Sequence, residues 1–180
     1  MIRENISRLF ARLSRLETIA VYWEPKIKTY GFKDVLGLSL LALEFQSGQL
    51  PDWGLGLYEM GDSEFHFELI FTQLKGKNVL QLYLLFEHKW EERLITHIHQ
   101  VIRKDAGETF HVTSPVDMVC FFGPHFGERY GIADAVFRAL TPEAIPVLAA
   151  SFSGSIIYLV LPEGMTKKAK GLLAETFEVP

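Results

Sequence analysis

The amino-acid sequence predicts an α+β protein built from two similar units in tandem, each with an antiparallel sheet and helices on one face. Three observations support this prediction. Stretches with the two-residue period of strands alternate with stretches that carry apolar residues at helical spacing. Turns rich in glycine and proline separate these stretches. The order strand, helix, strand, strand, helix, strand occurs twice along the 180 residues.

Composition and net charge are those of an ordinary globular protein. Apolar residues make up 48% of the chain and charged residues 22%, which is enough to fill one compact domain or two smaller ones. The formal net charge of -4 provides no broad basic surface, so we expect no nucleic-acid partner. No apolar stretch approaches the roughly 18 residues that span a bilayer, and no leader pattern is evident. We therefore expect a cytoplasmic protein with no membrane partner.

Aromatic residues are abundant, with 14 Phe, 6 Tyr and 3 Trp. Because such side chains bury large apolar areas in cores and interfaces, we expect a homodimer. Phe65, Phe67 and Phe71 alternate and are predicted to lie in the core or the dimer interface. They are not predicted to stack on RNA, since the basic-glycine-aromatic signature of RNA-recognition modules is missing. The single cysteine, Cys120, is predicted to be a small buried strand residue.

The first predicted element is a basic amphipathic helix over residues 2–16. Four arginines lie among apolar residues at helical spacing. A helix of this kind can lie on an anionic membrane, but we favour docking on its own domain or on a second copy of the chain. The apolar residues are Ile2, Ile6, Leu9, Phe10, Leu13 and Leu16.

Strand character follows at residues 18–23 and 26–30. A helix is predicted after Gly37, because four apolar residues follow at the i, i+3, i+4 and i+7 positions of one helix face. Gly48 and Pro51 are expected to end this helix. The four apolar residues are Leu38, Leu41, Ala42 and Phe45.

Three β-rich runs and a second helix complete the first unit. Hairpin turn sequences separate the runs. After them, apolar residues from Trp90 to Ile102 recur at helical spacing and predict a helix. Within this helix His97 and His99 would point to different faces, so we predict surface residues and no shared metal site. The three runs cover residues 54–60, 64–74 and 79–87.

The second half of the chain repeats this order. The successive elements are a strand at 116–122, a loop at 123–131, a helix from Ile132 to Leu140, strands at 145–151 and 155–161, and a helix that carries Ala169 to Phe177.

The repeated order is that of the ferredoxin-like fold, βαββαβ, in which helices cover one face of a four-stranded antiparallel sheet. We assign residues 1–17 to the N-terminal helix, 18–113 to the first unit and 114–180 to the second. The strand at 18–23 is an alternative partner for the sheet of the second unit.

In each predicted unit a strand ends in a glycine-containing loop that leads directly into a helix. The unpaired amides of a first helical turn favour a carboxylate or phosphate, and glycine lets a ligand approach the backbone closely. The two loops cover residues 31–38 and 123–132. Glycine turns of this kind are weak signals on their own, because most such junctions bind nothing.

Residues 26–38 resemble the opening of the first ACT domain of aspartate kinases, where a strand, a glycine, an aspartate and a Pro-Gly pair precede a helix. The second half is more similar to the second ACT domain of that family. The similarity lies in the loop at 123–131, in the helix and strand sequences at 131–160 and in the closing helix at 169–177. The resemblance covers residues 18–180. It departs from the family pattern at Leu36, which replaces the proline, and in the run 64–74, which resembles an added strand or an extended hairpin.

The resemblance implies a regulatory module that binds an amino acid, typically lysine or threonine, between ACT units and acts as a homodimer. Asp34 matches the position of the acidic residue that holds the ammonium group of the ligand, and the amides after it match those that take its carboxylate. The implied ligand-binding residues are Asp34, Val35, Leu36, Gly37, Leu38, Tyr58, Glu59 and Met60 in the first unit, and His125, Phe126, Gly127, Glu128, Arg129, Tyr130, Gly131 and Ile132 in the second.

No phosphate-binding loop or kinase signature occurs in the chain, so aspartokinase activity is excluded. We expect a sensor with no catalytic residue, no cofactor and no metal, which regulates an unidentified partner protein. Two alternatives remain open. One is an assembly protein with empty loops, and the other is a small ferredoxin-like enzyme that uses His125, Glu128 and Arg129.

Overall fold

The structure, a computed structural model, describes residues 26–62, 65–101 and 109–179. Six antiparallel strands form one sheet in the order β3-β4-β2-β5-β7-β6, and a short parallel pair joins β1 to β8. The strands are β1 (Ile27–Lys28), β2 (Phe32–Gln46), β3 (Phe67–Leu74), β4 (Val79–Glu87), β5 (Thr109–Phe122), β6 (Ala149–Ser153), β7 (Ile156–Pro162) and β8 (Phe177–Glu178). The α-helices are α2 (Leu50–Asp62), α3 (Glu91–Val101), α4 (Ile132–Leu140) and α5 (Thr166–Thr176), with short 3-10 turns at Ser47–Gln49, His88–Trp90 and Thr141–Glu143.

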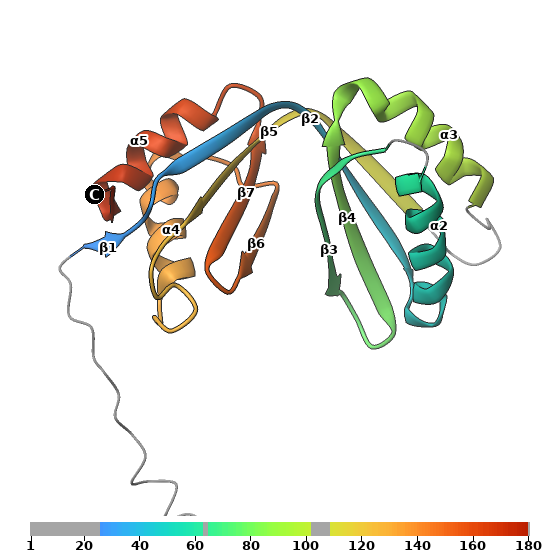
Figure 1. Ribbon diagram of the computed structural model, residues 1–180, viewed down its shortest axis with the longest axis horizontal. Helices are drawn as coiled ribbons and strands as arrows, with labels where there is room; N and C mark the ends of the chain where they lie inside the picture. Colours follow the sequence, from blue (N-terminus) through green and yellow to red (C-terminus); the bar gives the residue numbers. More distant parts are fainter. Residues whose placement is uncertain (1–25, 63–64, 102–108, 180) are drawn as a thin grey trace, which may run out of the picture.

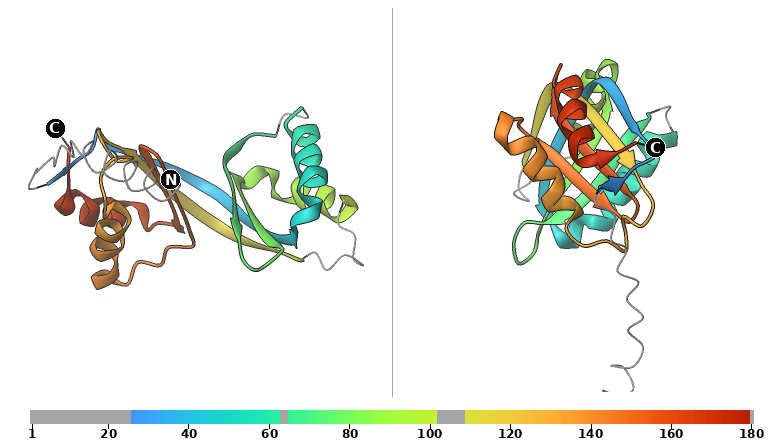
Figure 2. Two further views of the ribbon diagram at one scale, coloured as in Figure 1. Left: turned by 90° about the horizontal axis from the view of Figure 1, so that it is seen from below. Right: turned by 90° about the vertical axis from the view of Figure 1, so that its left-hand side faces the viewer.

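Two long central strands connect the two ends of the molecule (Figure 2, left view). β2 has 15 residues and β5 has 14, about twice the usual strand length. β2 pairs with β4 only from Leu38 onward, and β5 pairs with β7 only from Val116 onward. Leu38 and Val116 face each other in the register. They mark the boundary between a first half, which contains α2, β3, β4 and α3, and a second half, which contains α4, β6, β7 and α5.

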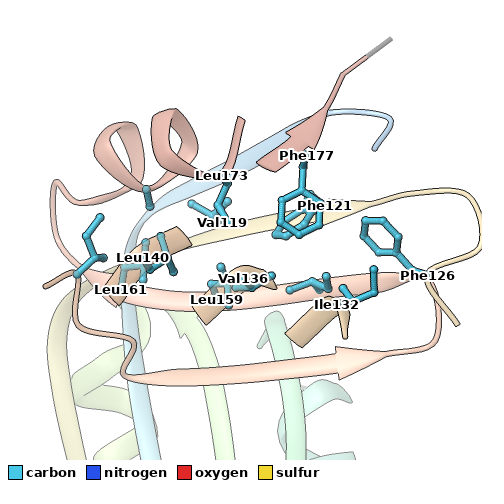
Figure 3. Close-up of a cluster of buried hydrophobic side chains, with 13 residues drawn as sticks. Val119, Phe121, Phe126, Ile132, Val136, Leu140, Leu159, Leu161, Leu173 and Phe177 are labelled. Atoms are coloured by element: carbon cyan, nitrogen blue, oxygen red, sulfur yellow. The ribbon is translucent and has the colours of Figure 1, made fainter. Parts of the chain in front are cut away.

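Each half buries its own apolar core between the sheet and its two helices. Figure 1 shows the helices on the outer flanks, and Figure 3 shows the core of the second half, where Phe121, Phe126 and Phe177 meet. The first half buries Trp53, Phe86 and other apolar side chains in the same way. A third cluster forms where the helix-free faces of the two halves meet. It contains Leu38, Leu40, Leu85, Val116, Met118, Ala149 and Val160.

The helix predicted after Gly37 is wrong, because residues 38–45 belong to β2. Leu38, Leu40 and Leu41 are all buried, since this part of the strand is covered on both faces of the sheet. A continuous apolar run of that kind also matches the i, i+3, i+4, i+7 positions of a helix by chance.

The strand predicted at 54–60 is also wrong, because these residues lie in α2. Pro51 occupies the first turn of this helix, where a missing N–H costs nothing, and does not end a helix. Trp53, Leu57 and Met60 turn one face toward the core at helical spacing. The glycines at 54 and 56 lower helix propensity and make the segment look like a strand in sequence.

The two errors compensate each other, so the first half still has the element order strand, helix, strand, strand, helix, strand. β3 is accordingly a regular member of this order and no added strand. Most of the remaining expected elements lie within a few residues of the observed ones, although the expected strand at 26–30 shortens to β1 and the one at 116–122 begins earlier, at Thr109 in β5. The helix expected at 2–16 and the strand expected at 18–23 lie outside the described residues.

Cys120 lies in β5 as expected, but it is only partly buried, and burial raises the pKa of its thiol. Among the helices that the structure describes, none is long and apolar enough to cross a membrane.

Candidate functional site

The first expected loop, residues 31–38, does not form a strand-to-helix junction, because β2 runs through it. The Asp34 carboxylate accepts a hydrogen bond from the ammonium group of Lys170 in α5, with an Nζ to Oδ1 distance of 2.8 Å. This hydrogen bond is the main reason why the pKa of Asp34 lies below its usual value. The position expected to hold the ammonium group of a ligand is therefore taken by an ammonium group of the protein itself.

The amides expected to bind a carboxylate in this segment do not face an open loop. The Gly37 N–H donates to Asp117 Oδ1 at 3.1 Å, and Leu38 is fully buried in the sheet. Val35 pairs with β5, and the Leu36 side chain is exposed. The polar groups of this segment are thus engaged in contacts within the protein.

Tyr58, Glu59 and Met60 lie on α2 in the first half, whereas Asp34 pairs with Val119 in the second half. Met60 is buried in the core of the first half, and the Tyr58 side chain is exposed. Within the described chain, the structure therefore does not bring these residues together with Asp34.

The junction that leads into α2 lies at Ser47–Gln49, where a helix end was expected from Gly48 and Pro51. The Gln46 N–H donates to Gln49 Oε1 at 2.8 Å, so a side chain of the junction occupies this amide. A serine-glycine pair followed by Pro51 in the next turn is the sequence signal that marks this helix start.

The second expected loop, residues 123–131, does lead from a strand into a helix, from β5 to α4. Gly123 is required there, because a Cβ at this position would lie 2.3 Å from the Lys28 carbonyl oxygen. Phe126 inserts its ring into the core of the second half, against Phe121 and Phe177. These two contacts fix the path of the loop in front of α4, and Figure 3 shows the Phe126 side chain among the core residues.

A cavity of about 350 Å³ lies at the start of α4. Six of the eight residues expected in this loop line it, and His125 and Glu128 do not. His125 Nδ1 instead lies 2.8 Å from Glu128 Oε2. The lining residues are Phe126, Gly127, Arg129, Tyr130, Gly131, Ile132 and Ala133 from the loop and helix, with Phe152, Gly154, Ile156 and Ile157 from the β6–β7 hairpin.

Sequence reasoning missed the hairpin side of this cavity. The Gly123 N–H donates to the Ser155 carbonyl at 3.4 Å, which places the β6–β7 turn beside the loop. The spacing of residues 152 and 157 gives no sign that they meet residues 126–133. The Ser153-Gly154 turn is the one available signal, since it places a hairpin tip at the end of β6.

The start of α4 offers backbone donors to this cavity. Gly131 is the N-cap residue with φ +83°, and no side chain caps the helix there. The first amides of an α-helix have no partner within the helix, and the positive end of the dipole lies beside them. With Arg129 among the lining residues, this arrangement favours a small carboxylate whose apolar part contacts Phe152, Ile156 and Ile157.

No protein-family model matches the sequence, and no curated protein sequence matches it. Solved structures do match. The ligand-free regulatory subunit of aspartate kinase from Thermus thermophilus has a TM-score of 0.69 at 13% identity, over 83% of this chain and 99% of that one. Aspartate kinase from Synechocystis has a TM-score of 0.75 at 14% identity, over 96% of this chain and 31% of that one.

Aspartokinase III of E. coli, in complex with lysine and aspartate in the T-state, has a TM-score of 0.58 at 14% identity, over 85% of this chain and 34% of that one. The matched share of each neighbour differs because some are separate regulatory subunits and others are whole kinases. Identities this low establish the fold alone. The chain has the fold of the regulatory region of aspartate kinases, as the sequence motifs indicated.

Proposed function

We propose that the protein is a regulatory module of two ACT-type units, without chemistry of its own, that binds an amino acid or related metabolite and acts as a homodimer. The observation that carries this proposal is the cavity of about 350 Å³ at the start of α4, within the usual size range of ligand pockets. The likeness to aspartate kinase regulatory subunits supports it at the level of the fold.

The order of the sheet supports two ferredoxin-like units. The strands β3-β4-β2-β5 of the first half, numbered along the chain, stand in the ferredoxin-like order 2-3-1-4. The strands β2-β5-β7-β6 of the second half give the same order if the N-terminal part of β2 serves as the last strand. We therefore propose a first unit at 38–115, inserted into a second unit formed by 26–37 and 116–179. This division replaces the linear one expected from sequence.

The chemistry of the cavity suits one end of a zwitterion. The first amides of α4 and Arg129 favour the carboxylate, while Phe152 and Ile156 accept an aliphatic side chain. No carboxylate of this chain lies among the described lining residues. In the homodimer expected from the sequence, a group from a second copy would hold the ammonium. The neighbour from E. coli was solved with lysine and aspartate, so lysine is the first amino acid to test.

Such a ligand would regulate a partner protein only by binding two arrangements of the units with different affinity. The contacts between the halves, where Leu85, Ala149 and Val160 pack together, are the place where such arrangements would differ.

The test is a thermal-shift panel of the common amino acids and nucleotides. A ligand at 100 times its Kd stabilises the folded protein by about 2.7 kcal/mol. Ala133→Asp should abolish the shift, because it adds a negative charge where the carboxylate binds, and an acidic residue in a first helical turn does not weaken the helix. Ala133→Asn, of equal size and neutral, is the matched control and should retain the shift.

If no amino acid raises the melting temperature, the sensor proposal fails and the assembly protein with empty loops takes its place. If a shift survives Ala133→Asp, the ligand binds somewhere other than the start of α4.

A further inference from the structure

The two helix pairs of the molecule pack differently. In the second half α4 and α5 contact each other closely, with small residues such as Ala135 and Ala169 at or beside the core. In the first half the backbones of α2 and α3 lie farther apart within the described residues, and a cavity of about 460 Å³ lies between the end of α2 and α3. The same element order therefore leaves a cleft beside the helix pair of the first half, at a place where α4 and α5 of the second half pack together.

The cleft has an apolar side and a polar side. Met60 at the end of α2 and Phe65 are buried and form the apolar side. The polar side is a single face of α3, where side chains recur one helical turn apart. These residues are Glu92, Arg93, Thr96, His97 and Gln100.

His97 contains the one buried side-chain nitrogen or oxygen without a hydrogen bond in the part of the chain that the structure describes, its Nε2 atom. Buried polar atoms are nearly always paired, and an unpaired one destabilises the folded protein. The imidazole ring forms part of the wall of the cleft. Because Nε2 has almost no solvent-accessible surface, the imidazole ring would have to turn toward the cleft for a polar ligand there to pair with it.

Charges of both signs lie at the cleft. The Arg93 guanidinium sits 4.9 Å from the ring centroid of Phe65 and 5.6 Å from that of Trp90, which holds its positive charge beside the apolar side. Glu92 precedes it on the same helix and also lines the cleft. The Thr96 hydroxyl is already bound to the Glu92 carbonyl at 2.8 Å, so it is a weaker candidate for ligand contact.

We propose that this cleft is a second, separate binding site, for a free α-amino acid with an apolar side chain. Its carboxylate contacts Arg93 and His97, its ammonium contacts Glu92, and its side chain lies against Met60 and Phe65. The site shares no residue with the cavity at the start of α4, so it can be tested independently of the function proposed above.

The test is isothermal titration of the full chain with L-leucine, L-methionine and L-phenylalanine. For leucine, 4-methylpentanoic acid lacks the ammonium group and 3-methylbutylamine lacks the carboxylate. We expect each of these to bind at least ten-fold more weakly than leucine. His97→Leu should weaken leucine binding at least ten-fold without lowering the melting temperature, because it removes an unpaired buried nitrogen. His111→Leu, the same change at an exposed strand position, should leave binding unchanged.

Glu92→Gln provides a second, exposed variant that should also weaken binding ten-fold while the fold is retained. The proposal is overturned if none of the three amino acids binds, or if binding is unaffected by both His97→Leu and Glu92→Gln. If Ala133→Asp removes all binding instead, the ligand occupies the cavity at α4 alone, which overturns the cleft and leaves the first proposal intact.

Discussion

The two halves of the molecule place a buried polar side chain at the same strand position but satisfy it in different ways. Ser39 follows Leu38 in β2, and Asp117 follows Val116 in β5, where the two strands face each other. Each polar residue holds the connection between a strand and the second helix of its half. The difference lies in what it binds.

Ser39 binds other side chains. Its Oγ lies 2.5 Å from Glu91 Oε2 and 3.0 Å from both His88 Nδ1 and Ser114 Oγ. Asp117 binds only backbone in the described chain, with Gly37 N–H at 3.1 Å and Gly164 N–H at 2.8 Å. Both glycines have positive φ, +71° for Gly37 in β2 and +79° for Gly164 in the turn before α5, so the carboxylate fixes two backbone conformations that other residues adopt poorly. The first half therefore depends on an ionisable side-chain network, and the second on one carboxylate.

The largest effect is expected for Asp117→Ala. Two backbone amides lose a charged acceptor inside the protein, which should lower the free energy of unfolding by about 3 kcal/mol. Ser39→Ala should cost only about 1 kcal/mol, because the remaining side chains of its network still pair with one another. Urea denaturation measures both, with the exposed Asp134→Ala as control. Equal losses would contradict the contrast between the halves.

A smaller, pH-dependent effect is expected for Glu91→Gln. Burial alone would raise the pKa of Glu91, but hydrogen bonds from Ser39 and Ser114 and the contact with His88 outweigh it, so the pKa lies below its usual 4.5. A lowered pKa in the folded state stabilises the protein above the unfolded value, and this contribution is lost as the pH falls below about 4.5 through the folded pKa.

The wild type should therefore lose more stability than Glu91→Gln between pH 6 and pH 3 in urea titrations, roughly the working range of carboxylates. Glu92→Gln, the same change at its exposed neighbour, serves as the control. Parallel pH profiles for wild type and Glu91→Gln would show that the network does not depend on ionised Glu91.

The smallest effect is expected for Lys170→Met. This change removes a surface ion pair in the half that also contains the buried Asp117 carboxylate, so the two contributions can be compared. The Lys170 and Asp34 side chains are 30% and 36% exposed. Exposed ion pairs contribute about 0.5 kcal/mol, so the free energy of unfolding should change by no more than this. The pKa of Asp34, followed by NMR titration, should rise toward its usual value. A loss comparable to that of Asp117→Ala would contradict the distinction.

The same comparison shows how much the sequence could predict. In the second half, period and turn signals placed α4, β7 and α5 within a few residues, because α4 and α5 are amphipathic and β7 is a short strand between clear turns, whereas β5 begins at Thr109, well before the predicted strand at 116–122. In the first half β2 is buried on both faces, so its apolar run carries no period of two. A proline such as Pro51 can stand at the start of a helix or mark its end. Only the packing of Trp53 and Met60 against the core decides between these two positions.

The candidate site was predictable only where it is local in sequence. The loop before α4 was found because glycines and a helix start lie together at residues 123–132. Its other wall, including Phe152 and Ile157, comes from a hairpin that only the folded sheet brings beside the loop. The pairing of Asp34 with Lys170 joins residues 136 positions apart and has no sequence signal.

The most direct test of the account is a crystal structure of the protein grown with the amino acid that raises its melting temperature most. We predict a ligand carboxylate at the amides of Ile132 and Ala133 and an ammonium contact from a second copy of the chain. A saturating ligand bound elsewhere, with the cavity at the start of α4 empty, would contradict the proposal that this junction is the sensory site.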